Sequence, residues 1–446
     1  MLFVRFLKIN LTPARFLAAG FALMIALGSL LLSLPFASTA GKVSFVDALF
    51  TATSAVCVTG LAVKDTGTFY TVFGQFVIMF LILGGALGFM TTATLIFVLL
   101  GKKITLKDRL MIKEALNTDS IQGLVHLIII IARMAALTIL LGSLLLGFRF
   151  LPQYGWKKGL LFSFFHAISA FGNCGFDLFG NFQSLTSYAS DYLVSGTISA
   201  LFIFGGLGFT VVLDLLQRKK AARYALHSRL VLFFTAFLLI FGTLFIFCLE
   251  GNNSATLGGL PLGSKVFQAF FTAATPRTAG FNVVPTDSLY PGTLFFIIIL
   301  MFIGASPAST GGGIKTTTFI LIIGTVRALL MGSDEVVFGG KRIPPSLILK
   351  AFTITVISIS LIFIIIFALT IVEEQPFLDL TFEVFSAFGT VGLSTGVTPY
   401  LSTTGKLLLI ITMYAGRIGP LTLLYALTRK FKPSGIRYPE EKILIG

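Results

Sequence analysis

Long apolar runs recur along the whole chain and are separated by short polar segments. A helix that crosses a bilayer needs about 20 predominantly apolar residues. Eight stretches reach that length: 15–35, 71–100, 123–148, 191–216, 228–249, 293–325 (interrupted), 345–372 and 404–428. This pattern predicts an all-α polytopic membrane protein whose two ends lie on the same side of the membrane.

Four shorter apolar segments lie between an odd-numbered and an even-numbered span, at 46–57, 159–172, 264–276 and 377–389. At 12 to 14 residues they are too short to cross a bilayer. This length is typical of a re-entrant segment, and an amphipathic helix on the outer surface is the alternative. The recurrence of all four in the same place favours the re-entrant interpretation.

Each short segment is followed by a similar phrase that ends in a glycine and a large apolar residue. These glycines are Gly60, Gly175, Gly280 and Gly392, at separations of 115, 105 and 112 residues. A near-constant period indicates repeated structural units. We therefore predict four helix–pore loop–helix repeats around a pseudo-fourfold axis, with eight transmembrane helices and four re-entrant pore helices. The predicted repeats cover residues 1–110, 111–222, 223–335 and 336–430, and a cytoplasmic tail covers 431–446.

The glycine phrases are candidates for a cation-selectivity filter. A short re-entrant helix directs its C-terminal carbonyls, which carry partial negative charge, toward the bilayer centre. The chain returns through an extended stretch whose carbonyls lack ladder partners, and rings of such carbonyls replace the hydration shell of a cation. A single glycine would more simply be a helix cap or a packing contact, but four in register favour the filter. The predicted ion ligands are Cys57, Val58, Thr59, Gly60, Asn173, Cys174, Gly175, Arg277, Thr278, Ala279, Gly280, Gly389, Thr390, Val391 and Gly392.

The sixth span is broken by a segment rich in glycine, serine and proline. Proline and three consecutive glycines destabilise a helix interior by several kcal/mol in total, roughly the sum of their propensities. We predict that residues 304–316 form a loop below the third filter phrase and act as a gate; a simple kinked helix is the alternative. The candidate gate residues are Gly304, Ser306, Pro307, Ser309, Thr310, Gly311, Gly312, Gly313, Lys315 and Arg417.

Charged residues inside the predicted spans are few. Arg417 lies in the middle of the last span, where a charge is costly unless it is paired or hydrated. It either adds an electrostatic barrier to cation passage or anchors neighbouring helices. Arg133 and Asp214 lie near span ends, which favours structural roles. His166 is expected to be a hydrogen-bonded packing residue.

The composition supports a membrane protein, with 56% hydrophobic and only 11% charged residues. The net charge of +15 reflects the orientation of the chain in the membrane, because 22 of the 33 Lys and Arg residues lie in five segments at the ends of apolar spans. By the positive-inside rule these segments and both termini are cytoplasmic. The chain is therefore expected in the plasma membrane, without nucleic acid as a partner. Three cysteines imply no disulfide framework.

Several motifs together resemble the Trk/Ktr/HKT potassium transporters. They are Thr59-Gly60-Leu61, His-Ala-Ile-Ser-Ala-Phe before Asn173, Thr-Pro-Arg-Thr-Ala-Gly-Phe at 275–281, Ser-Ala-Phe-Gly-Thr-Val-Gly-Leu at 386–393, and Gly-Arg-Ile-Gly-Pro around Arg417. The resemblance covers essentially the whole chain and is strongest to the membrane subunit of a bacterial Ktr system.

The resemblance implies potassium uptake through a gated pore, with K⁺ bound at the filter residues and sodium as an activator. It further implies that Arg417 faces the pore and fixes the gate loop. It also implies a homodimer that sits on a cytosolic ring of nucleotide-binding RCK subunits. Glycine at position 60 favours potassium, because a serine there is associated with sodium-selective plant relatives. Cys57 and Cys174 depart from the family pattern and are expected to be small packing residues rather than redox groups.

No nucleotide-binding motif, metal-protease motif or acid–base pair is visible in the sequence, so neither an enzyme nor a bound cofactor is expected. An intramembrane enzyme would need a nucleophile or metal constellation at depth. A secondary transporter with broken helices and alternating access remains the alternative. Such folds usually contain inverted repeats, whereas the four units here share one orientation.

Overall fold

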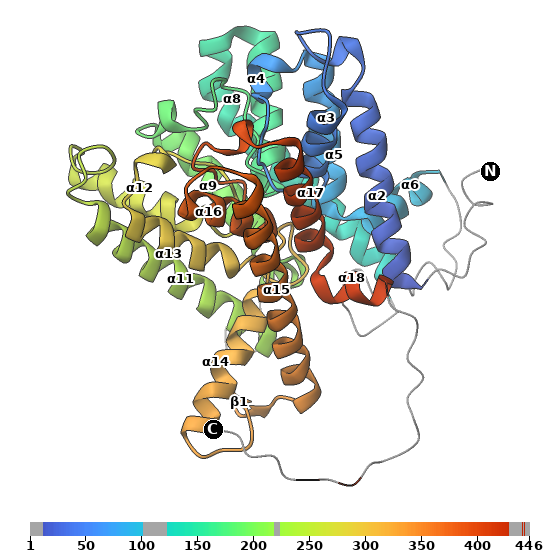
Figure 1. The fold of residues 1–446 in the computed structure, drawn as a ribbon, viewed down its shortest axis with the longest axis vertical. Helices are drawn as coiled ribbons and strands as arrows, with labels where there is room; N and C mark the ends of the chain where they lie inside the picture. Colours follow the sequence, from blue (N-terminus) through green and yellow to red (C-terminus); the bar gives the residue numbers. More distant parts are fainter. Residues whose placement is uncertain (1–11, 101–122, 218–223, 428–438, 440, 442–446) are drawn as a thin grey trace.

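The computed structural model describes residues 12–100, 123–217, 224–427, 439 and 441. Its architecture is almost entirely helical (Figure 1). The helices are α2 (Pro13–Leu32), α3 (Phe45–Val56), α4 (Thr66–Phe69), α5 (Val72–Leu87), α6 (Phe89–Leu99), α8 (Leu124–Phe171), α9 (Tyr192–Gly206), α10 (Phe209–Leu216), α11 (Leu226–Glu250), α12 (Leu262–Ala274), α13 (Pro291–Phe302), α14 (Thr316–Leu330), α15 (Pro345–Val372), α16 (Phe377–Gly389), α17 (Thr403–Ile418) and α18 (Pro420–Leu427). Short 3-10 turns occur at Pro35–Ala37, Thr186–Tyr188, Thr286–Ser288 and Thr398–Tyr400.

Four of these helices, α2, α8, α11 and α15, are long and apolar enough to cross a membrane. Within the described residues the number rises to seven if each of three bent helix pairs is counted as one span. Many large apolar side chains on these helices are exposed, including Phe148, Phe233 and Phe367 at 69–73%. Side chains of this size that face outward on several helices are typical of a surface covered by lipid. The chain is therefore a mostly helical, polytopic membrane protein.

Three predicted spans, 71–100, 191–216 and 404–428, are each broken into two helices, and these breaks were not predicted from the sequence. The pairs α5–α6, α9–α10 and α17–α18 are bent by 100°, 98° and 99°. The residue at each break is a glycine with positive φ: Gly88 at 83°, Gly208 at 93° and Gly419 at 91°. A right-handed helix cannot pass through such a residue, whereas glycine adopts this backbone conformation readily.

The interruption predicted in the sixth span is confirmed, since α13 ends at Phe302 and α14 begins at Thr316. The predicted span 123–148 and the short segment 159–172 both lie within the 48 residues of α8, which consists of two helices that meet at a kink at Gly155 (φ 76°). Besides the helices, β1 (Val337–Phe338) and β2 (Lys341–Arg342) form an antiparallel hairpin between α14 and α15.

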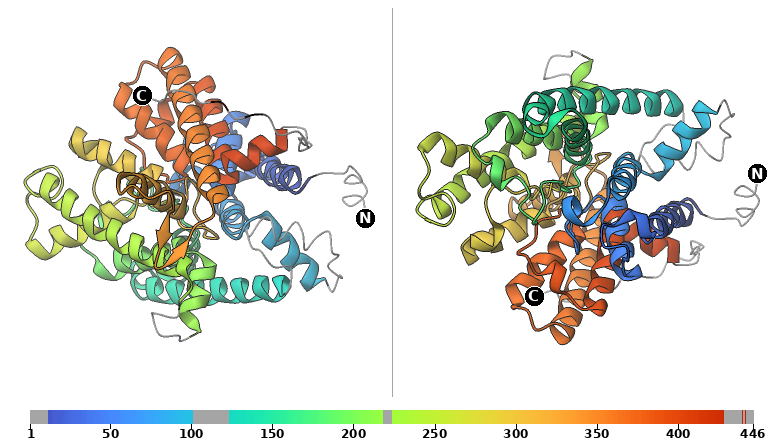
Figure 2. Two further views of the ribbon diagram at one scale, coloured as in Figure 1. Left: turned by 90° about the horizontal axis from the view of Figure 1, so that it is seen from below. Right: turned by 90° about the horizontal axis from the view of Figure 1, so that it is seen from above.

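Seen along the vertical axis of Figure 1, successive parts of the chain occupy successive sectors around one centre (Figure 2). The first part of the chain (blue) is followed around the centre by the green, yellow and red parts, and loops fill the middle. The hairpin, α14 and the start of α15 extend farthest from this body (Figure 1). The basic residues Arg5 and Lys8, the 102–113 loop, part of the 218–229 loop and most of the tail 431–446 lie outside the described residues.

Candidate functional site

Four short glycine-containing segments follow helices α3, α8, α12 and α16 and share one backbone conformation. In each, the residue two positions before the glycine has a positive φ: Val58 58°, Asn173 59°, Thr278 70° and Thr390 50°. The glycines that follow have φ values of 93°, 78°, 78° and 94°. Positive φ is uncommon in residues that carry a side chain. Its recurrence at one place in all four segments indicates four structurally equivalent turns.

The four glycines form a closed ring. A Cβ atom added to Gly60 would overlap the carbonyl oxygen of Cys174 and lie 3.3 Å from the Cα atom of Gly175. A Cβ atom on Gly175 would lie 2.8 Å from the Cα atom of Gly280, one on Gly280 3.2 Å from that of Gly392, and one on Gly392 3.1 Å from that of Gly60. Gly175 and Gly392 therefore face each other across the ring. Because backbone atoms fill the space that each Cβ would need, the ring has room only for glycine.

The segments 57–60, 173–175, 277–280 and 389–392 are called the glycine segments below. Within the described part of the chain, no main-chain hydrogen bond outside the helices is accepted by a carbonyl of 57–60, 173–175, 277–280 or 390–392. Buried carbonyls are nearly always paired. Unpaired carbonyls gathered beside the negative ends of four helix dipoles form a site that favours a cation. The buried hydroxyl of Thr59 also lacks a partner among the described residues.

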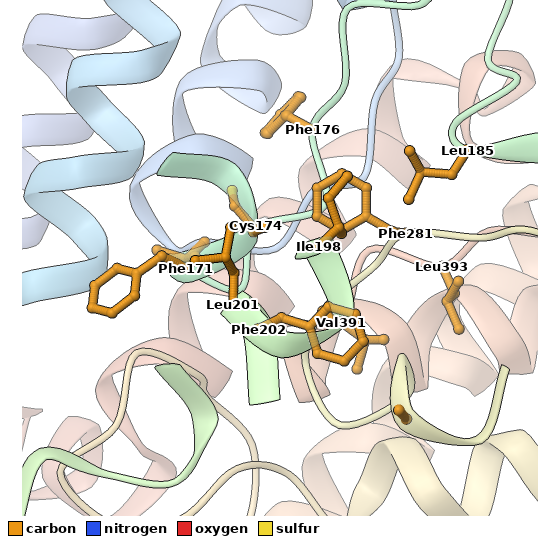
Figure 3. Close-up of a cluster of buried hydrophobic side chains, with 14 of the residues drawn as sticks. Phe171, Cys174, Phe176, Leu185, Ile198, Leu201, Phe202, Phe281, Val391 and Leu393 are labelled. Carbon is orange, nitrogen blue, oxygen red and sulfur yellow. The ribbon is translucent and has the colours of Figure 1, made fainter. Parts of the chain in front are cut away.

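A hydroxyl group near the end of each of the four helices forms a hydrogen bond with the backbone of the ring glycine or of the residue that follows it. The bonds join Ser54 Oγ to the N–H of Gly60 (3.0 Å), Ser169 Oγ to the carbonyl of Phe176 (2.7 Å), Thr275 Oγ1 to the carbonyl of Phe281 (2.5 Å) and Ser386 Oγ to the N–H of Gly392 (3.1 Å). The large apolar residue after each glycine is buried, and three of the four, Phe176, Phe281 and Leu393, lie in the apolar cluster of Figure 3. These contacts orient the segments while leaving their own carbonyls free.

The loop between α13 and α14 lies directly against the glycine segments. Thr310 Oγ1 donates to Asn173 Oδ1 at 3.1 Å, and the N–H of Gly312 donates to Thr390 Oγ1 at 3.0 Å. A Cβ atom on Gly311 would lie 2.9 Å from Cβ of Thr278. Three of the four residues with positive φ therefore contact this loop through their side chains.

The same loop also forms backbone hydrogen bonds with the residues around the break between α9 and α10. The N–H groups of Ser306 and Thr310 donate to the carbonyls of Gly206 and Gly205 at 3.1 and 3.3 Å. In return the N–H of Phe209 donates to the carbonyl of Ala308 at 2.8 Å. The bend at Gly208 thus frees backbone groups that bind the loop, which explains why the break and the loop occur together.

Arg417 connects the loop to two helices. Its Nη1 donates to the carbonyl of Thr310, and its Nη2 donates to the carbonyls of Gly85 and, at 3.5 Å, Ala86 near the end of α5. Lys315 Nζ donates to the carbonyl of Gly311 at 2.6 Å. The structure therefore brings Arg417 and Lys315 to the loop with which the sequence grouped them.

The predicted ligand and gate residues lie in these two adjoining regions, except Arg417, which lies in α17 and reaches the loop with its side chain. Other gate residues make contacts that shape the loop. Ser309 Oγ donates to the carbonyl of Ser306 at 2.6 Å. The carbonyl oxygen of Pro307 packs closely on Gly208, where an added Cβ atom would lie 2.5 Å from it. Gly85, Gly205 and Gly416, on which the rest of the site packs, were not predicted as site residues. The signal was present as Gly-Gly-Ala-Leu-Gly at 84–88, Gly-Gly-Leu-Gly at 205–208 and Gly-Arg-Ile-Gly at 416–419.

The other singled-out residues have simpler surroundings. Cys57 and Cys174 are fully buried free thiols, as packing residues would be. The Arg277 side chain is buried and donates to Thr235 Oγ1 at 3.2 Å. Asp214 Oδ2 accepts from the N–H of Ala225 at 2.9 Å, and Arg133 is exposed.

Two carboxylates follow the ring in the loops that lead away from it. Asp177 accepts from the N–H of Phe179 at 3.0 Å, and Asp65 accepts from the N–H of Phe182 at 2.8 Å. Burial, together with the nearby carboxylate of Asp65, raises the pKa of Asp177 to about 7. The charge of this group therefore changes near neutral pH.

Comparison with known proteins points to one class of protein. The TrkH family model, described as a cation transport protein, matches residues 24–436. The Ktr system potassium uptake protein B of Bacillus subtilis is 48% identical over 438 residues, which cover 98% of each chain. The potassium/sodium uptake protein NtpJ of Enterococcus hirae is 40% identical over 444 residues, again 98% of each. The crystal structure of the potassium transporter TrkH from Vibrio parahaemolyticus shares the fold, with a TM-score of 0.72 at 18% identity over 94% of this chain and 86% of that one.

Proposed function

The chain belongs to the TrkH family of cation transport proteins, and on this premise we propose that it takes up potassium ions through a pore lined by the four glycine segments. The observation that carries the proposal is the closed ring of Gly60, Gly175, Gly280 and Gly392. Their segments come from distant parts of the sequence and bring buried, unpaired carbonyls to one axis. Such carbonyls replace the water around a bare cation.

In this proposal α3, the end of α8, α12 and α16 are four re-entrant pore helices. The other helices make eight crossings, the even-numbered ones broken near their middle. The four helix–pore loop–helix repeats then have the predicted bounds 1–110, 111–222, 223–335 and 336–430. Pseudo-fourfold symmetry follows, because each repeat contributes one segment to the ring.

Loop 304–316 is the gate of this pore. It contacts three glycine segments through Asn173, Thr278 and Thr390, so a loop in this position closes the path of an ion that leaves the ring. Arg417 latches the loop to α5 and adds a positive charge on the conduction path. Opening requires these polar contacts to break, which makes the gate responsive to movements of α5 and α17.

Potassium is the proposed substrate because all four ring positions are glycine, and the relatives named above include a potassium uptake protein and a potassium/sodium uptake protein. We further propose sodium stimulation, a location in the plasma membrane with both termini cytoplasmic, and a homodimer. The relatives named for Ktr systems suggest further components, and a cytosolic nucleotide-binding RCK ring is the proposed partner.

The competing function is a secondary cation transporter with alternating access. The broken helices α5–α6, α9–α10 and α17–α18 favour it, because transporters often bind substrate at helix breaks. The two functions differ in flux. A pore shows no stoichiometric exchange and is blocked by a permeant cation of matching size, whereas a transporter exchanges substrate at a fixed ratio.

The test is complementation of a strain that lacks potassium uptake, across a range of external potassium and sodium. The wild-type chain should restore growth at low potassium. Gly60→Ser and Gly392→Ser should lose discrimination against sodium, because each added side chain displaces a carbonyl of the neighbouring segment.

Gly396→Ser is the matched control. Gly396 has the same φ of 94° as Gly392 and lies four residues later, but a Cβ atom there has no neighbour within 4 Å. Backbone strain therefore affects both variants, and displacement of the ring affects only Gly392→Ser. Failure of the wild type to support growth at low potassium, or equal sodium sensitivity in Gly392→Ser and Gly396→Ser, would contradict the proposed function.

A further inference from the structure

Two of the four helices that precede the glycine segments make an additional bond to the chain beyond the ring. The N–H of Leu178 donates to His166 Nε2 at 3.2 Å, and the N–H of Thr395 donates to Glu383 Oε1 at 3.1 Å. His166 and Glu383 each lie nine residues before their ring glycine, and Leu178 and Thr395 each lie three residues after it. The two bonds are therefore the same contact in two repeats.

The equivalent positions in the other two repeats lack this contact. Thr51 in the first repeat accepts a bond from the hydroxyl of Tyr70 at 3.0 Å, and Phe271 in the third is a buried apolar side chain. Gly175 and Gly392 lie opposite each other in the ring. The bonds therefore act on one diagonal of the ring and leave the other diagonal without them.

Both ring nitrogens of His166 form hydrogen bonds with the main chain. Nε2 accepts from the main-chain N–H of Leu178, so the proton lies on Nδ1, which donates to the carbonyl of Phe162 at 2.7 Å. The ring is fully buried and stacks on Phe179, with centroids 4.3 Å apart. A neutral imidazole held in this way has one orientation, and it fixes the N–H of Leu178 at one distance from the helix.

Glu383 holds the fourth repeat with more bonds. Its fully buried carboxylate accepts from Ser394 Oγ at 2.6 Å and the N–H of Thr395 at 3.1 Å through Oε1. It accepts from Thr398 Oγ1 at 2.5 Å through Oε2. Three donors from residues 394–398 therefore bond to one side chain, and these bonds attach the chain that follows the fourth glycine segment to α16.

We propose that His166 and Glu383 are positioning residues for two opposite sides of the ring. By holding Leu178 and Thr395, they set the width of the ring entrance, meaning the opening next to the chain that follows Gly175 and Gly392, and so the preference for potassium over sodium. This inference rests on the proposed function. Extended segments without ladder partners keep their spacing only through bonds to the surrounding protein. Releasing Leu178 or Thr395 lets the entrance contract around a smaller cation, which weakens discrimination by size.

The test uses the full chain in proteoliposomes and compares potassium uptake with sodium uptake in each variant. His166→Phe keeps an aromatic ring against Phe179 but has no acceptor, and Glu383→Leu removes all three bonds. In both, the potassium-to-sodium uptake ratio should fall about tenfold, the change expected when a hydrogen bond that favours one of two states is lost. His166→Gln restores an acceptor and should recover most of the ratio.

Phe271→Leu is the control for altered packing at the same helix position in a repeat that lacks the bond, and its ratio should equal that of the wild type. Glu383→Gln retains an acceptor oxygen and keeps the proposal testable if Glu383→Leu does not fold; its ratio should lie between those of wild type and His166→Phe. An unchanged ratio in His166→Phe, or an equal fall in Phe271→Leu, would overturn the proposal. A wild-type chain without potassium preference would instead overturn the proposed function.

Discussion

Replacing Thr390 with valine should release the loop that closes the pore. Valine has the shape and β-branching of threonine, so the strain at φ 50° and the packing are retained. The change removes the acceptor of the Gly312 N–H, which is bonded at 3.0 Å in a buried position. An unsatisfied buried donor costs about 1–3 kcal/mol. Only the loop-bound state bears this cost, so the ratio of released to bound loop should rise about 5- to 150-fold.

Two measurements in proteoliposomes check this prediction. Potassium flux through Thr390→Val should exceed the wild-type flux in the absence of any cytosolic partner. For the second measurement, Ser309→Cys is introduced in a Cys248→Ser background, in which the remaining thiols Cys57 and Cys174 are buried. The new cysteine should react faster with a charged thiol reagent when Thr390→Val is also present than when Thr390 is retained, because the released loop is more accessible.

Thr390→Ser is the matched control, since serine keeps the hydroxyl that accepts from Gly312. Its flux and labelling rate should stay close to those of the wild type. If Thr390→Val behaves like the wild type, or if the serine and valine variants behave alike, the hydrogen bond does not hold the loop.

Three other outcomes follow from the same geometry. Arg417→Gln should raise basal flux by about tenfold or more, because a charge-assisted bond to the carbonyl of Thr310 is worth about 1.5–3 kcal/mol; unchanged flux and assembly would rule out the latch. Deletion of 307–312 should raise uptake and loosen its dependence on the cytosolic partner, and equal flux in vesicles would count against a gate. Asp177 is mostly neutral at pH 6 and mostly ionised at pH 8, because burial raises its pKa to about 7. The ratio of wild-type to Asp177→Asn uptake at low potassium should therefore rise from pH 6 to pH 8, and a constant ratio would show that this carboxylate does not attract the ion.

The repeating pattern, the interrupted sixth span and the candidate filter and gate residues could be predicted from the sequence. Apolar length determines which helices suit a bilayer, and a glycine that recurs after each short helix identifies equivalent turns without any knowledge of contacts. The membership in a cation transport family was indicated by the motifs that resemble the Trk/Ktr/HKT transporters. Gly60, Gly175, Gly280 and Gly392 could be found because their spacing is a property of the chain alone.

The tertiary structure decided which groups meet. Hydropathy does not distinguish a straight span from one bent at Gly88 or Gly208, since both halves are equally apolar and only the contacts of the freed backbone groups stabilise the bend. The bond from Leu178 to His166 and that from Thr395 to Glu383 join residues 12 apart, whose equivalence becomes visible only once the chain folds back on its own helix. Burial then gives these polar contacts their importance, because water no longer competes for the same donors.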